Sequence, residues 1–345
     1  MIWPLDLGLR MAAMLGFILF TALVLIWVER KFLGHIQMRL GPMRTGFHGV
    51  LQSPADAVKL LLKEDLMPAS ADRWVFQLAP LVVVLPAFMI WVSIPFTREL
   101  VVRSLDMGIF YIVAISALSI VGMVMAGWAS DNKYALLGAA RSAAQMISYE
   151  LPLVFSILGV VMVAGSLDLR EIVDRQAAVP FLILQPLGFL LFLMAGLAEV
   201  SRTPFDIPHA ESEVVGGPFV EYSGIRWGFF FAAEYINTFA VAALCALLFL
   251  GGWNWPGLPP LVWFLVKTYA VVLVIIWLRA TFPRLRIDQL MSFAWKFLLP
   301  LAFLNILLNG LYLFYGWPSW TVSLASLAVV VGAGLELRRR QRRTG

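Results

Sequence analysis

Long apolar runs separated by short polar segments make up most of the chain. Nine such runs lie near 7–28, 75–95, 107–128, 147–165, 180–198, 229–250, 259–278, 297–315 and 318–335. A helix of about 20 apolar residues crosses a bilayer, because it satisfies its own backbone polar groups where no water is present. The pattern predicts an all-α integral membrane protein of about nine transmembrane helices, forming a single domain over 1–345.

Composition agrees with this fold class. Hydrophobic residues make up 61% of the 345 residues and charged residues 14%, against roughly 25% charged residues in an ordinary soluble domain. The first apolar run lacks a basic leading region and a small-residue cleavage site, so we expect a retained helix rather than a signal peptide. The composition therefore argues against a soluble fold.

The distribution of Lys and Arg predicts the orientation. Twenty of them fall in the segments after odd-numbered spans and in the C-terminal tail, five fall on the other side, and Lys267 lies within a span, where we expect it to pair with a carboxylate. Cytoplasmic loops are enriched in basic residues. We expect the N-terminus outside and the C-terminus in the cytoplasm. The net charge of +5 follows from this topology and predicts no nucleic acid partner.

Few residues could hold a redox centre. Cys245 is the one cysteine of the chain, and His35, His48 and His209 are scattered outside the predicted spans. An iron–sulfur cluster needs several thiolate ligands and haem needs one or two axial ligands. We expect this chain to bind no cofactor and no metal.

The segment 29–74 is too long and too patterned for a simple connection. Ser53, Pro54 and Asp56 have the form of an N-cap, a proline at the first helical position and an acidic first turn. An apolar face, including Leu61, alternates with a polar one. We expect an amphipathic helix over 53–64 at the cytoplasmic membrane interface. It either has a functional role or only anchors the loop.

Carboxylates gather in the segment 199–228, which prolines and a glycine pair break into a folded loop. Five of them occur within 23 residues: Glu199, Asp206, Glu211, Glu213 and Glu221. Three more lie close to or inside predicted spans, namely Glu29, Glu150 and Glu234. Ionisable groups within a membrane indicate function, and crowded carboxylates favour proton handling. The alternative is that they are helix-end charges that reach water.

Six ordered blocks resemble a known family: ERKFLGHIQMRLGP at 29–42, ADAVKLLLKED at 55–65, GWASDNKYALLGAARSAAQMISYEL at 127–151, AEVSRTPFD at 198–206, ESEVVGGPFVEYS at 211–223 and RATFPRLRIDQLM at 279–291. They are similar to the H subunit of bacterial complex I, which is called subunit 1 in mitochondria. The resemblance implies an eight-helix core of tilted helices plus a C-terminal helix, in the bacterial inner membrane. It also implies partners: the quinone-reducing subunits of a soluble arm, antiporter-like membrane subunits and membrane lipids.

The resemblance further implies that this chain forms much of a chamber for its substrate, quinone, while FMN and the iron–sulfur clusters lie in partner subunits. It assigns a proton-coupling path to Glu29, Asp56, Glu150, Glu199, Asp206, Glu211, Glu213, Glu221 and Glu234. It places Arg30, Arg39, Arg279, Arg284 and Arg286 at or near the chamber wall.

The chain departs from the family pattern at two places. His209 stands where many relatives have a glutamate, and Gln52-Ser53-Pro54 replaces a more hydrophobic stretch. These departures affect one member of the acidic path and the shape of the quinone entrance. Two alternatives remain at this point: the corresponding subunit of a membrane-bound hydrogenase or of a ferredoxin- or coenzyme-dependent relative, and a stand-alone cation or proton transporter.

Overall fold

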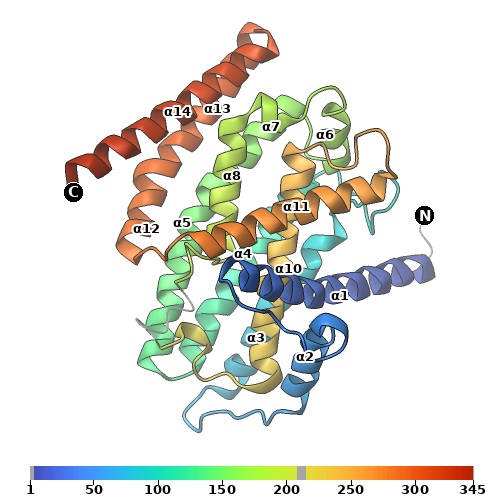
Figure 1. The fold of residues 1–345 in the computed structure, drawn as a ribbon, viewed down its shortest axis with the longest axis vertical. Helices are drawn as coiled ribbons and strands as arrows, with labels where there is room; N and C mark the ends of the chain where they lie inside the picture. Colours follow the sequence, from blue (N-terminus) through green and yellow to red (C-terminus); the bar gives the residue numbers. More distant parts are fainter. Residues whose placement is uncertain (1–3, 208–214, 345) are drawn as a thin grey trace.

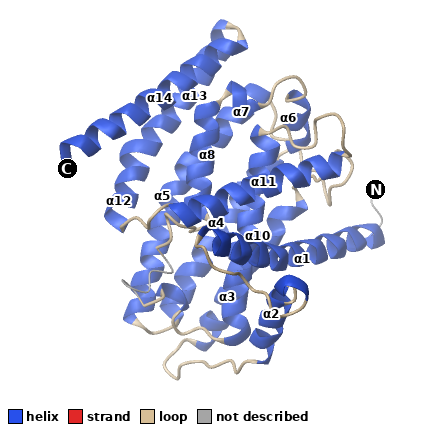
Figure 2. Cartoon of the chain, in the orientation of Figure 1, coloured by secondary structure: helices blue, strands red, loops and turns tan. Residues whose placement is uncertain are grey.

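A computed structural model describes residues 4–207 and 215–344, and within these ranges it is helical with no strand (Figure 2). Seven runs are long and apolar enough to cross a membrane. They are α1 (Pro4–Ile36), α3 (Arg73–Met89) continued by η2 (Ile90–Val92), α4 (Gly108–Ala129), α5 (Lys133–Ala164), α10 (Gly224–Phe249), α11 (Pro260–Thr281), and the series α12 (Ile287–Phe293), the π-helical turn η4 (Ala294–Leu298) and α13 (Leu299–Tyr315). Two shorter apolar helices are α8 (Pro186–Glu199) and the first part of α14 (Ser319–Thr344). The predicted membrane fold is confirmed.

Two predicted spans differ from the observed helices. The run 180–198 is divided into α7 (Phe181–Leu184) and α8, because Pro186 at the start of α8 has no N–H to continue the preceding turn. By contrast, α5 begins well before residue 147, at the N-cap Asn132, whose side chain accepts a hydrogen bond from Tyr134 N. The polar residues of its first half interrupt the apolar pattern, so the sequence did not predict this part of the helix. One of them, Gln145, is nevertheless fully buried rather than exposed.

The amphipathic helix is present as α2 (Gln52–Leu62), but the predicted cap at Ser53 is wrong. The N-cap residue is Leu51, and Ser53 is buried within the first turn. Gln52 supplies the polar contacts of this turn: its side chain accepts from Thr45 Oγ1 at 2.7 Å and donates to Asp56 Oδ1 at 2.9 Å. The remaining short elements are η1 (Phe47–Gly49), α6 (Leu169–Arg175) and η3 (Gly217–Phe219).

Helix α10 forms the centre of the bundle. It is the most deeply buried of the long helices and packs against α1, α3, α8 and α11. In Figure 1, α1 and α11 cross α10 at a steep angle, while α3, α5 and α8 run more nearly along it. As a result, the C-terminal ends of α1 and α11 and the loop after α8 come together beside the N-terminal half of α10.

Lys267 forms hydrogen bonds at the C-terminal end of α10. Its ammonium donates to the carbonyl oxygens of Leu250 and Asn254 at 2.8 and 2.9 Å, and it lies 4.6 Å from the centre of the Trp255 ring. The expected pairing with a carboxylate is therefore wrong. A cation at a helix C-terminus satisfies carbonyl groups that have no partner within the helix and complements the helix dipole.

Candidate functional site: a buried carboxylate and arginine cluster

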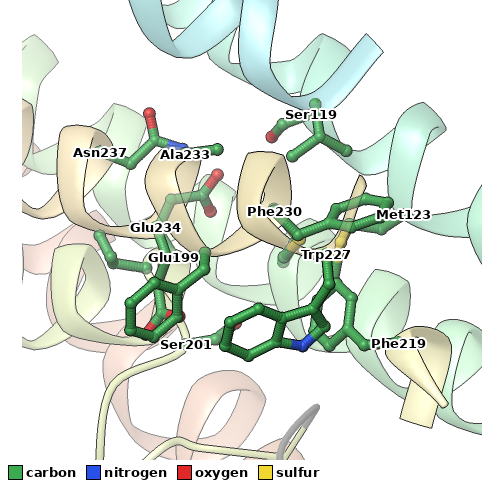
Figure 3. A pocket seen from close by; sticks show the side chains of 14 residues that line it. Ser119, Met123, Glu199, Ser201, Phe219, Trp227, Phe230, Ala233, Glu234 and Asn237 are labelled. Atoms are coloured by element: carbon green, nitrogen blue, oxygen red, sulfur yellow. The ribbon is translucent and has the colours of Figure 1, made fainter. Parts of the chain in front are cut away.

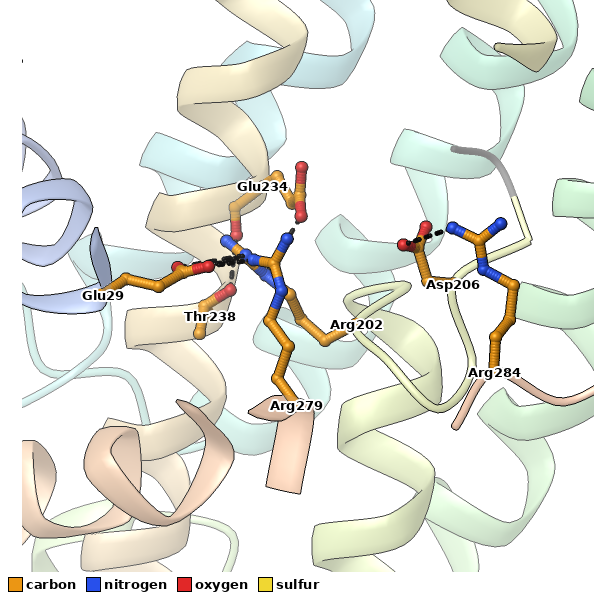
Figure 4. Close-up of polar contacts among 7 residues, drawn as sticks. All are labelled: Glu29, Arg202, Asp206, Glu234, Thr238, Arg279 and Arg284. Atoms are coloured by element: carbon orange, nitrogen blue, oxygen red, sulfur yellow. Dashed lines mark hydrogen bonds and ion pairs between the residues drawn. The ribbon is translucent and has the colours of Figure 1, made fainter. Parts of the chain in front are cut away.

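Four charged side chains from distant parts of the chain meet inside the bundle (Figure 4). They are Glu29 near the end of α1, Arg202 in the loop after α8, Glu234 in α10 and Arg279 near the end of α11. The side chains of Glu29 and Arg202 are only 7% and 4% exposed. Glu29 is thus a buried member of the site and not a helix-end charge that reaches water.

Arg202 is the centre of this four-residue cluster. Its Nη1 lies 3.2 Å from both carboxylate oxygens of Glu29, and its Nε forms an ion pair with Glu234 Oε1 at 3.0 Å. The guanidinium carbon lies 4.3 Å from the centre of the Tyr235 ring, and Arg279 Nη1 contacts Glu29 directly. Burial by itself would lower the pKa of Arg202, but the carboxylates of Glu234 and Glu29 outweigh it and raise that pKa. Arg202 therefore stays a cation.

The loop after α8 is held in place by hydrogen bonds from α5 and from the segment before α12. Gln145 donates from Nε2 to the carbonyl oxygens of Ala198 and Phe205, at 2.8 and 2.6 Å. Phe205 is buried, and the Pro204 carbonyl accepts a hydrogen bond from Leu285 N at 3.0 Å. These contacts place Asp206 opposite Arg284, 3.1 Å away (Figure 4). The RTPFD motif therefore supplies one charge to each of two ion-pair sites.

A cavity adjoins the cluster. It is lined by Glu234, by Glu199, and by aromatic side chains that include Trp227 and Phe230 (Figure 3). The cavity offers about 60 Å³ to water, and one water molecule needs about 10–15 Å³. It therefore has room for several water molecules. Glu150, from α5, lies close enough to Glu199 for the two carboxylates to repel one another. Glu234 thus belongs both to the cluster and to the cavity that leads toward Glu199.

The other residues of the predicted site lie elsewhere. Asp56 pairs with Arg30 at 2.6 Å on a more exposed surface, and Glu221 accepts from Asn132 Nδ2 at 2.7 Å. Arg39 is exposed and donates to Gln37. Arg286 is exposed just before α12. The predicted positions Glu211, Glu213 and His209 lie outside the described residues.

The sequence reasoning missed the central residue of the cluster. Arg202 counted only as a loop charge, although it lies between Glu199 and Asp206 directly after an apolar helix. A cation so close to buried carboxylates was the available signal, since buried charges need partners. Tyr235 and Gln145 carried no comparable signal, because their roles depend on contacts between distant segments.

The bundle and its buried ion pairs define a multi-pass membrane protein with a charged site enclosed by its helices. Comparison with known sequences shows to which family of membrane proteins the chain belongs. The model of the family described as NADH dehydrogenase matches residues 9–310. The NADH-quinone oxidoreductase H subunit of Dehalococcoides mccartyi is 49% identical over 333 residues, covering 96% of this chain and 94% of that protein. The corresponding H subunit of Geobacillus kaustophilus is 53% identical over 310 residues, covering 88% of this chain and 91% of that protein.

The chain therefore belongs to the NADH dehydrogenase family, in agreement with the resemblance drawn from its motifs. It is a membrane subunit of an oxidoreductase complex, and the other subunits of that complex are its partners.

Proposed function

We propose that this subunit forms much of a quinone-binding chamber and couples quinone reduction to proton translocation through its carboxylates. Reduction of a quinone to a quinol takes two electrons, which arrive from iron–sulfur clusters and FMN in partner subunits, and two protons. The names of the relatives, which include quinone, favour this function over that of a hydrogenase subunit. The observation that carries the proposal is the buried cluster around Arg202.

The cluster is balanced in charge, with two carboxylates facing two guanidinium groups. Charges interact more strongly inside a protein than in water. A change of charge in the neighbouring chamber, such as the formation of an anionic quinone intermediate, alters the energy of each ion pair. Protonation of Glu29 or Glu234 restores the balance, and so a redox event becomes a proton movement.

A path away from the cluster follows the cavity. Glu234 and Glu199 both line it, and Glu150 lies near Glu199. The cavity has room for water molecules that would carry a proton between these carboxylates. On this proposal, Arg30, Arg39, Arg284 and Arg286 border the chamber and the soluble arm, and antiporter-like subunits receive the signal.

The proposal also assigns a membrane and an orientation. The chain lies in a bacterial inner membrane with its N-terminus outside. The orientation follows from the basic residues, because twenty of them fall on the side of the membrane that holds the C-terminus and five on the opposite side. Lys63→Cys, at an exposed position after the first span, and a cysteine in the tail should react with impermeant reagent from the same side of the membrane. Reaction from opposite sides would overturn the orientation.

The test replaces Arg279 by glutamine in the assembled complex. Loss of this cation leaves Glu29 with one guanidinium partner and removes positive charge beside the chamber. We expect quinone reduction to fall by roughly tenfold or more, whereas NADH oxidation with an artificial acceptor that bypasses the chamber stays normal. Lys296→Gln, at an exposed cation of the π-helical turn, is the matched control. Equal loss of both activities in an assembled Arg279 variant would contradict the proposal.

A further inference from the structure

A groove lies between α1, α11 and the loop 93–107, far from the charged cluster. Arg10 lines it 19 residues before Glu29 in α1, and Leu261 lines it 18 residues before Arg279 in α11. At 1.5 Å per helical residue these separations amount to roughly 28 and 27 Å. In Figure 1 the N-terminal ends of both helices lie on the same side of the molecule, near the letter N. This α1–α11 groove is therefore separate from the cluster around Arg202.

The groove is large and mostly apolar. Its volume is about 650 Å³, and sites that hold small molecules have volumes of about 300–1,000 Å³. Its apolar wall includes Met14 and Phe17 from α1, Phe96 from the loop and Leu265 from α11. The buried ring of Phe96 makes edge-to-face contacts with Phe17 and Phe264, with centroids 5.4 and 5.6 Å apart. These contacts join the loop to both helices, so the groove is built into the fold.

The polar groups of the groove gather where α1 and α11 begin. Arg10 Nε pairs with Asp6 Oδ2 at 3.1 Å, and Arg10 Nη1 donates to the Val101 carbonyl at 3.3 Å. A guanidinium carries five N–H groups, so three remain to bind an anion. Glu99, which also lines the groove, is exposed and forms no ion pair among the described residues. Arg98 beside it pairs with Asp174 instead, at 3.5 Å.

A phospholipid has the same arrangement of charge and apolar surface as the groove. Its tails fit the apolar wall, but the surrounding bilayer is equally apolar, so the headgroup decides which lipid is preferred. A phosphate accepts charge-assisted hydrogen bonds from Arg10. Because Asp6 and Glu99 also lie at this end, a headgroup that carries a cation is favoured over a purely anionic one. A quinone has no charge to pair with either group.

We propose that the α1–α11 groove binds a phospholipid whose headgroup carries a phosphate and a primary ammonium, such as phosphatidylethanolamine. The phosphate binds Arg10, the ammonium binds Glu99, and an acyl chain lies along Met14 and Phe17. This site goes beyond the proposed function, because it holds a lipid and not the quinone. The bound lipid links the first part of α1, which is largely exposed, to the loop 93–107 and to α11.

Photolabelling of the assembled complex in phosphatidylcholine vesicles tests the site in the unaltered protein. Two photoreactive lipids with the same acyl chains are compared, one with an ethanolamine headgroup and one with a glycerol headgroup, and labelled peptides are identified by mass spectrometry. We expect the ethanolamine lipid to label the peptides that contain Phe17 and Leu265 about threefold more, the effect of one exposed ion pair. Peptides with the exposed Leu324 of α14 should be labelled equally by both.

Equal labelling of the groove by the two lipids would overturn the proposal. Labelling of Leu324 without labelling of the groove would show that another subunit covers it, and would overturn the proposal as well. Because labelling needs no turnover, neither result depends on the proposed role of the chain in quinone reduction.

Variants then test the two headgroup contacts. Glu99→Gln should reduce labelling by the ethanolamine lipid to the level of the glycerol lipid, and Arg10→Gln should reduce labelling by both. Glu171→Gln and Arg175→Gln, at exposed positions of α6 outside the groove, are the matched controls and should change nothing. An unchanged preference in Glu99→Gln would contradict the ammonium site. The comparison of lipids in the unaltered complex decides the question even if Arg10→Gln does not assemble.

Discussion

Arg202 contacts two carboxylates at once, the buried Glu29 and the largely buried Glu234. Arg202→Met removes that cation, and we expect the protein to lose about 3–5 kcal/mol of stability, because the change leaves buried charge uncompensated. Arg202→Lys should be intermediate, since one ammonium cannot reproduce contacts made from Nη1 and Nε. The thermal unfolding midpoint of the purified complex measures this. Arg202→Met/Glu234→Gln, which leaves Glu29 paired with Arg279, should melt above Arg202→Met. A midpoint for Arg202→Met equal to that of the unaltered protein would contradict the account.

At the scale of single residues, the sequence predicts acids better than their partners. Glu29 and Glu234 stand out because a carboxylate in an apolar run is costly. Their pairing with Arg202 depends on the crossing of α1, α10 and α11 with the loop after α8, and no local pattern encodes that geometry.

Helix α2 presents apolar side chains to its surroundings. Val58, Leu61 and Leu62 are 52%, 63% and 82% exposed, although the helix packs on α1 and α10 through its other face. If this face borders the membrane entrance of the chamber, Leu62→Ser should raise the KM for a long-tailed quinone about fivefold. The change removes an apolar contact that stabilises the bound tail by roughly 1 kcal/mol. The KM for a short-tailed, water-soluble quinone should not change.

Steady-state kinetics of the assembled complex with the two quinones measures the difference. Lys59→Ser, on the exposed polar side of α2, is the matched control. Equal shifts in KM for both quinones would show that α2 does not act on the tail.

At the scale of elements, apolar runs located nearly every long helix, because crossing a bilayer requires them. The misses have physical causes. The first half of α5 carries Arg141 and Gln145, yet the helix continues through them because Gln145 finds carbonyl partners inside the protein. The division of α7 from α8 depends on Pro186, and prolines also lie inside uninterrupted helices, such as Pro152 in α5. A proline alone therefore does not distinguish the two outcomes.

At the scale of the whole molecule, steeply crossing helices bring charges from opposite ends of the chain to one place. Glu29 and Arg279 are 250 positions apart and touch (Figure 4). The motif blocks suggested that these residues belong together, but only the fold explains how, through the central position of α10. The cluster, the cavity and Glu199 then form one connected region along α10 and the end of α8.

The central claim is that Glu234 links the cluster to the proton path, and the most direct test is the number of protons moved per quinone reduced by the assembled complex in sealed vesicles. Glu234→Gln keeps the size of the side chain but cannot ionise. We predict a lower ratio with NADH oxidation by an artificial acceptor unchanged, and an unchanged ratio for Glu171→Gln, at an exposed carboxylate in α6. An assembled Glu234→Gln complex with normal quinone reduction and a normal proton ratio would contradict the account.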